Sequence, residues 1–218
     1  QNEGLGFKKA FQALLNFSDH ESLDLNGRRI QLSGPVDLHA AVNNKDAFEI
    51  RRVIRNGQFE PVHGAAWDTE VTTSSASYSA SNARELSNVA NIGAIQVGML
   101  VQGNGVGREV YVKSVNTGAQ TLTLSAELFD AEGTQVFTFT RFKYLLDFTG
   151  FDKVSALEFE GIDFSMEGVC SGILLCPDGH SMTIRDCQFN KPMDRSITSP
   201  VTGCTGLDIS DVIIHSRD

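Results

Sequence analysis

The sequence predicts an all-β protein whose main body is a parallel β-helix, with a capping helix at its N-terminal end and a small antiparallel β domain inserted between two rungs. Three observations predict this architecture. A short motif recurs with a spacing of 25 residues, a stretch of helical period precedes it, and a segment of different composition interrupts the series. The chain has 218 residues, 41% of them hydrophobic, which is enough to bury a core and excludes a disordered protein.

The first element is an amphipathic helix. Phe7, Ala10, Phe11, Leu14 and Leu15 recur at helical spacing, which predicts a helix over residues 5–16. The first rung of a solenoid would otherwise expose unpaired strand edges and an open apolar core. We therefore expect residues 1–20 to cap the β-helix.

A six-residue motif then occurs four times, in copies that begin at Ile54, Phe159, Ile184 and Ile209. Alternating apolar residues in its first half predict a strand with one buried face. An Asn, Asp or Gly follows, a residue type that tolerates the left-handed conformation and allows a sharp bend. A second short strand comes next and buries an apolar residue at the end of the motif.

A third strand per rung is predicted around residues 173–175 and again around 196–198. Three short strands and three bends in one repeat are typical of a rung of a parallel β-helix, whereas no helix or LxxLxL run indicates another solenoid. We assign the first rungs to residues 21–66 and the later rungs to residues 143–218, with about five rungs in all.

The insertion lies between the first motif copy and the second, which start 105 residues apart. Residues 69–87 are rich in Ser, Thr, Ala and Asn, and alternating stretches separated by glycine-containing turns follow them. This pattern is typical of antiparallel hairpins and predicts a small β domain over residues 67–142. The alternating stretches are residues 97–101, 110–115, 121–124 and 136–142.

The last rung motif, residues 207–214, is followed by only four residues. An uncovered last rung would expose its apolar core and an unpaired strand edge. We therefore expect either further rungs in a longer polypeptide or another chain to cover it.

Charge and spacing exclude several classes of protein. The net charge is −9 and no basic stripe is present, so we expect no nucleic-acid partner. No apolar run is long enough to span a membrane. The His and Cys residues match no metal-ligand spacing, so we expect no metal site. The cysteines are expected to be mostly buried thiols: Cys170, Cys176, Cys187 and Cys204.

Three segments of the solenoid resemble the opening of pectate-lyase-like right-handed β-helix proteins: residues 10–15, 23–28 and 53–57. That superfamily includes polygalacturonase-related enzymes and bacteriophage tailspike depolymerases. Residues 97–103 and 120–125 of the insertion are similar to a small β module of phage and bacterial surface proteins. The resemblance implies a right-handed β-helix, frequent trimer formation, and binding to or action on surface polysaccharides.

Two acidic residues, Asp186 and Asp211, occupy the bend position of successive rungs, where neighbouring strands lie about 4.8 Å apart. Such a pair could act as general acid and nucleophile in glycoside cleavage, or hold Ca²⁺ for lyase chemistry. Gly161 shares this column with Asn56, which favours a structural role in which the side chains bond to neighbouring backbone.

A second set of carboxylates lies in or beside the segments that precede each motif. Acid and base catalysis needs paired carboxylates, and long grooves on β-helices follow such strands. Charged residues in the turns of a solenoid are also ordinary surface residues, so both interpretations stay open. The candidate catalytic residues are Asp147, Glu167 and Asp194, with Arg195 beside them.

Aromatic rings are the candidates for carbohydrate contact, because their faces suit the C–H faces of pyranoses. Trp67 and Tyr78 are the first choices, since they lie in the polar stretch that leads into the insertion, whereas Tyr111 and Tyr144 are weaker ones. A role in the core is the alternative for all four.

The leading hypothesis is a spike-like β-helix protein on a virion or particle surface, or outside the cell, that binds a polysaccharide and could degrade it. Trimerisation would cover the long flat faces of a short β-helix, so we expect a homotrimer, with other particle proteins as further partners. A polysaccharide hydrolase or lyase is the alternative, with Ca²⁺ as a cofactor only for a lyase. A structural adaptor in a larger assembly is the third hypothesis.

Overall fold

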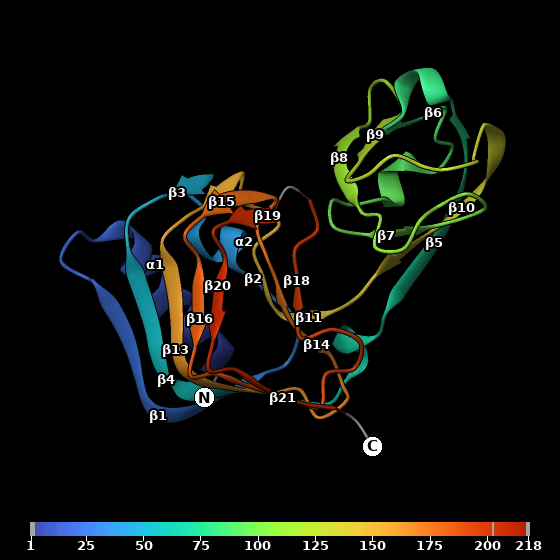
Figure 1. Ribbon diagram of the computed structural model, residues 1–218. Coiled ribbons are helices and arrows are strands. Elements are labelled where there is room, and N and C mark those ends of the chain that lie inside the picture. Colours follow the sequence, from blue (N-terminus) through green and yellow to red (C-terminus); the bar gives the residue numbers. More distant parts are fainter. Residues whose placement is uncertain (1–2, 202, 217–218) are drawn as a thin grey trace. The chain divides into compact units, whose positions relative to one another are not determined.

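The computed structural model describes residues 3–201 and 203–216, which form two units (Figure 1). The solenoid unit comprises the chain up to Asp68, Lys143–Ser199 and the segment from Gly203 onward. The inserted domain consists mainly of Thr69–Phe142. Trp67, at the predicted start of the insertion, belongs to the solenoid unit.

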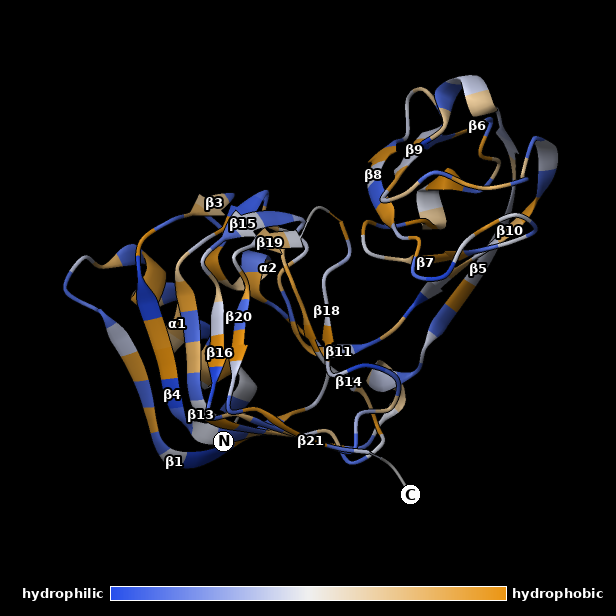
Figure 2. Cartoon of the chain, in the orientation of Figure 1, coloured by the Kyte–Doolittle hydropathy of each residue, from blue (hydrophilic) through white to orange (hydrophobic). Residues whose placement is uncertain are grey.

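The solenoid unit is a parallel β-solenoid whose motif copies stack directly on one another. Ile54 lies opposite Phe159, Phe159 opposite Ile184, and Ile184 opposite Ile209. Orange segments on the neighbouring strands of Figure 2 mark such stacked hydrophobic residues. The repeat therefore predicted both the parallel pairing and its register correctly. The main sheet has the order β1 (Ser22–Leu32), β4 (Arg52–Pro61), β13 (Leu157–Ser165), β16 (Thr183–Arg185) and β20 (Asp208–Ser210), with β17 (Gln188–Asn190) and β21 (Ile213–His215) beyond the bend.

Further parallel strands form the other faces of the rungs. Ile173 pairs with Ile197, as the predicted third strand of each rung requires. One sheet has the order β18 (Ile197–Thr198), β14 (Ser171–Leu174), β11 (Tyr144–Asp147) and β2 (Val36–Asp37). Two shorter pairs are β12 (Lys153–Val154) with β3 (Ala47–Phe48), and β15 (Asp178–His180) with β19 (Gly203–Thr205).

The bend column has the left-handed backbone conformation that its residue types predict. Asn, Asp and Gly adopt positive φ at low cost, so each strand can turn at this point without a clash. The φ angles are 52° at Asn26, 58° at Asn56, 60° at Gly161, 51° at Asp186 and 53° at Asp211. The interpretation of Asp186 and Asp211 as bend residues is thus confirmed.

A row of phenylalanine rings fills the core behind the bend. Phe59 stacks on Phe164 with the ring centroids 5.7 Å apart, and Phe164 stacks on Phe189 at 4.6 Å. Phe7 of the N-terminal helix meets the ring of Phe59 edge-on at 4.8 Å. All four rings are buried, so the row runs from the helix through three successive rungs.

The predicted N-terminal helix is present as α1 (Glu3–Asn16). It buries Phe7, Phe11, Leu14 and Leu15 in the same core as the strands, and it contacts β1. The carbonyl of Leu14 accepts a hydrogen bond of 2.9 Å from Nε of buried Arg52. A second helix, α2 (Leu38–Val42), and a 3₁₀ turn, η1 (Ala65–Trp67), were not predicted. No helix in the described ranges is long and apolar enough to cross a membrane.

The inserted domain is an antiparallel sheet with a core of its own. The longest strand pair joins β5 (Glu70–Tyr78) and β10 (Gly133–Arg141). Phe137 and Phe139 of β10 are fully buried. Strand β5 lies in the Ser- and Thr-rich stretch for which no strand was predicted. The order is β7 (Leu100–Gln102), β10 (Gly133–Arg141), β5 (Glu70–Tyr78), β6 (Glu85–Ser87), β9 (Thr121–Leu124) and β8 (Val112–Asn116), with 3₁₀ turns η2 (Ala80–Asn82) and η3 (Ile92–Ala94).

The last rung keeps the register of the core but not its burial. Ile209 pairs with buried Ile184 and is 46% exposed, and Ile214 pairs with buried Phe189 and is 58% exposed. Within residues 3–201 and 203–216, no further strand lies beyond β20 and β21. These two isoleucines thus occupy core positions of the repeat that only one neighbouring rung covers.

Candidate functional site

A polar groove of about 280 Å³ follows the bend column on the solenoid surface. Three of its lining positions are Gly27, Gly57 and Gly161, and a Cβ added at Gly27 or Gly161 would meet no atom within 4 Å. Polar side chains from successive rungs surround these glycines, because the bend column and the position two residues after it both face the groove. They are Asn56, Gln58, Asp163, Asp186 and Gln188.

Strand register places three of these groups in one row. Gln58 on β4 lies opposite Asp163 on β13, and Asp163 lies opposite Gln188 on β17. Arg29 of β1 extends the row and donates from Nε to Oε1 of Gln58 at 3.2 Å. Nδ2 of Asn190 donates to Oδ1 of Asp163 at 2.5 Å. The groove thus presents alternating amide and carboxylate groups at the strand spacing, about 4.8 Å.

A second row of charges on the main sheet is already neutralised. The carboxylate of Glu158 lies 2.8 Å from Nη2 of Arg51 and 2.6 Å from Nε of Arg185. Arg185 also reaches Glu160 on the same strand as Glu158, at 3.2 Å. Because each carboxylate in this row has a guanidinium partner, the row links neighbouring rungs and offers no free acid or base.

The three carboxylates proposed from sequence are placed on separate segments. Asp147 ends β11, where its side chain accepts from the backbone N–H and the hydroxyl of Thr149 at 2.9 and 2.6 Å. Glu167 follows β13 with φ of 51°, and its carboxylate lies 3.7 Å from Nζ of Lys191. Asp194 is exposed in the segment before β18, next to Arg195. None of the three lines the polar groove.

The aromatic candidates for sugar stacking are buried. Trp67 is 2% exposed and donates from its indole N–H to the carbonyl of Val62, while Tyr78 is 5% exposed and donates to the carbonyls of Ala83 and Leu128. Tyr111 and Tyr144 are buried as well. Burial leaves no open ring face, so this placement gives the sugar-stacking hypothesis no support.

One exposed aromatic ring escaped the sequence reasoning. Phe129 of the inserted domain is 85% exposed, more than any other large apolar side chain in the described ranges. Its backbone N–H donates to the carbonyl of Gly105, which fixes the loop that carries it. The neighbouring residues give no periodic signal that separates this phenylalanine from a core residue. Only the exposed fraction of its side chain in the structure identifies it.

A serine–histidine contact lies on another face of the solenoid. The hydroxyl of Ser155 is 2.7 Å from Nδ1 of His180 and also accepts the backbone N–H of His180 at 3.1 Å. Ser155 is fully buried, so its hydroxyl cannot reach a substrate. The contact links two rungs and does not form a nucleophilic site.

The cysteines and acidic residues form no metal centre in the part of the chain that the structure describes. The four thiols are free, and Cys170, Cys176 and Cys187 are buried, as expected. Burial raises the pKa of Cys170 to about 12 and the pKa of both Cys176 and Cys187 to about 11, so these thiols stay protonated and inert at neutral pH.

No protein-family model matches the chain, and no curated protein matches it. The fold is a parallel β-solenoid. This architecture is consistent with a β-helix superfamily, and the polar groove is its candidate site.

Proposed function

We propose that the protein is a spike-like β-helix protein that binds a cell-surface polysaccharide in the polar groove. The observation that carries the proposal is the row of Gln58, Asp163 and Gln188, which repeats hydrogen-bonding groups along the stacking direction. A linear glycan repeats its hydroxyl groups in the same way. One glycan molecule can therefore form hydrogen bonds with the polar side chains of several rungs. Amide and carboxylate oxygens accept from sugar hydroxyls, and amide N–H groups donate to them.

A neutral glycan suits the site better than a polyanion. The chain carries a net charge of −9, and two carboxylates, Asp163 and Asp186, line the groove. A polyanionic glycan would meet charge repulsion unless Ca²⁺ bridged it to these groups. Calcium is therefore part of the proposal only for an acidic polysaccharide.

The wider assignment rests on the resemblance to pectate-lyase-like proteins. We propose a right-handed solenoid, since connections between parallel strands of one sheet are right-handed in the great majority of proteins. We also propose a homotrimer outside the cell or on a virion or particle surface, in contact with other particle proteins. A purely structural adaptor would share this location but would bind no glycan.

Cleavage of the bound glycan is the second candidate function, and one observation favours it. Asp163 and Asp186 line the same groove and come from neighbouring rungs. Glycosidases use two carboxyl groups that flank the scissile bond about 5–9.5 Å apart. In this proposal Asp163 and Asp186 take the place of Asp147, Glu167 and Asp194 as the acid–base candidates.

A glycan array probed with the whole chain tests the binding proposal. We expect one glycan class to bind, and the double substitution Gln58→Ala with Gln188→Ala to weaken it at least about tenfold, because each lost hydrogen bond contributes about 1 kcal/mol. Gln31→Ala is the matched control, since Gln31 is exposed on β1 of the same solenoid but lies outside the groove.

Two outcomes would contradict the binding proposal. Silence on the array together with a stable complex with a particle protein would indicate the adaptor. Equal binding by the double variant and the wild type would show that the groove is not the binding site.

New reducing ends or unsaturated sugars that disappear in Asp163→Asn and Asp186→Asn would establish cleavage in addition to binding.

A further inference from the structure

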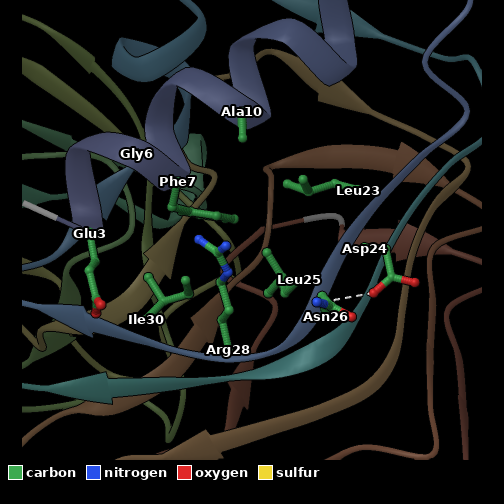
Figure 3. Close-up of a pocket in the computed structure, with 10 residues that line it drawn as sticks. All are labelled: Glu3, Gly6, Phe7, Ala10, Leu23, Asp24, Leu25, Asn26, Arg28 and Ile30. Carbon is green, nitrogen blue, oxygen red and sulfur yellow. Dashed lines mark hydrogen bonds between the residues drawn. The ribbon is translucent and has the colours of Figure 1, made fainter.

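A second hollow, of about 400 Å³, lies between α1 and β1 (Figure 3). This volume falls within the usual range for small-molecule sites, roughly 300–1,000 Å³. Most of its lining is apolar and comes from both elements, with Phe7 and Ala10 on the helix and Leu23, Leu25 and Ile30 on the strand. The polar groups that line it are Glu3, Asp24, Asn26 and Arg28.

An irregularity of β1 creates this lining. Asp24 pairs with Arg55 and Arg28 pairs with Gly57, so β1 has three residues where β4 has only Asn56. The extra residues place Leu25 over Gly57, where an added Cβ would lie 2.6 Å from the Cβ of Leu25. The first rung therefore differs from the later ones, and the hollow forms where α1 crosses it.

The two acidic groups of the hollow already have partners. Asp24 accepts from the backbone N–H of Asn26 at 2.8 Å, and its other oxygen is 3.2 Å from Nε of Arg55. These contacts, the Asn26 hydrogen bond first, lower the pKa of the Asp24 carboxyl. Glu3 accepts the backbone N–H of Gln31 at 2.9 Å and lies in the first turn of α1, where the helix dipole favours a negative charge.

Among the described residues, Arg28 is the charged group of the hollow that lacks a hydrogen-bond or ion-pair partner. Figure 3 shows its side chain extending from β1 toward Phe7 and Ala10 of the helix. No residue in the described ranges forms an ion pair or a hydrogen bond with its guanidinium. Arg29, the next residue, differs in this respect, because its Nε lies 3.2 Å from Oε2 of Glu60 and also donates to Gln58.

We propose that this hollow binds a small amphiphilic carboxylate, with its acyl or aromatic body between Ala10 and Leu23 and its carboxylate on Arg28. A guanidinium matches a carboxylate with two parallel hydrogen bonds, and the apolar lining beside Arg28 offers a surface for the body of the same ligand. A cationic ligand would find only carboxylates that are already engaged. The site is separate from the polar groove and does not depend on the function proposed for it.

Octanoate is the probe, and octan-1-ol is its neutral counterpart. We expect calorimetric titration of the whole chain to show octanoate binding in preference to octan-1-ol. Arg28→Gln should weaken octanoate binding by about tenfold or more, because hydrogen bonds to charged groups contribute more than neutral ones. The same substitution should leave octan-1-ol binding unchanged.

Arg29→Gln is the matched control and should bind octanoate as the wild type does, because Arg29 does not line the hollow. Both arginines are exposed on β1, so neither substitution is expected to disturb folding. Ala10→Phe, which fills the hollow from the helix, should weaken both ligands. Failure of octanoate to bind, equal affinity for the alcohol, or unchanged binding by Arg28→Gln would overturn the proposal.

Discussion

Phe164 and Phe189 stack with their ring centroids 4.6 Å apart and their planes 15° from parallel, although 25 residues separate them in the chain. The separation equals the motif period, so one turn of the solenoid brings the same position of the repeat back onto itself. The ring of Phe59 continues the stack on the other side of Phe164. The repeat in sequence and the aromatic row in the core are therefore the same feature.

Replacing the central ring should strongly destabilise the solenoid. Phe164→Ala removes a fully buried ring that contacts Phe59, Phe159 and Phe189, and we expect a loss of about 3–5 kcal/mol in the free energy of unfolding. Phe17→Ala is the control, because Phe17 is 60% exposed, and it should change stability by less than about 0.5 kcal/mol. Denaturant titration measures both, and equal effects would contradict the stacked core.

The bend column should tolerate glycine better than alanine. Asp186 has φ of 51°, so Asp186→Ala should cost about 1 kcal/mol of stability, whereas Asp186→Gly should be nearly neutral. The control pair is Asp194→Ala and Asp194→Gly, at an exposed position where φ is not positive and alanine should be no worse than glycine. If alanine and glycine are equivalent at residue 186, the left-handed bend does not limit stability there.

The buried thiols should make the solenoid sensitive to high pH. Burial raises the pKa of Cys170 to about 12, and of Cys176 and Cys187 to about 11, from an ordinary value of 9.0. The protonated thiol is thus favoured in the folded state. The contribution of the buried thiols to the free energy of unfolding is complete below pH 9 and is lost progressively as the pH rises from 9 to about 11–12. Stability measured against pH should fall over that window, and Cys170→Ala should make the fall shallower.

The same burial predicts an order of thiol reactivity. Cys204 is only partly buried and should react first with a thiol-selective disulfide reagent at pH 8, while the other three cysteines react slowly. Mass spectrometry of the labelled protein gives the order. Rapid labelling of Cys170 in the folded protein would show that the core is open.

Sequence reasoning succeeded where the repeat determines structure. Ile54, Phe159, Ile184 and Ile209 could be placed in register because stacked rungs bury the same positions. It failed for β5, because the buried face of this strand carries Ser74 and Ala76 and the exposed face carries Val71, so the sequence shows no apolar–polar alternation. The period alone therefore identified the solenoid, whereas the strands of the inserted domain depended on weaker local signals.

The candidate sites were less accessible to sequence reasoning than the fold. Trp67 and Tyr78 have the chemistry for sugar contact, but only the packing reveals that both rings are buried. The groove forms beside the bend column, where Gly27 and Gly161 leave space, and the motif indicates this column only as a turn. The hollow beside Arg28 depends on a shift of register between β1 and β4, and no sequence pattern predicts this shift.

Hydrogen exchange with and without the glycan found on the array tests the central claim most directly, because it locates the bound chain. We predict slower exchange at residues 56–58, 161–163 and 186–188, which belong to three rungs and line one groove, and unchanged exchange in the inserted domain. Protection confined to the inserted domain, or to the backbone around Asp147, Glu167 and Asp194, would contradict glycan binding in the polar groove.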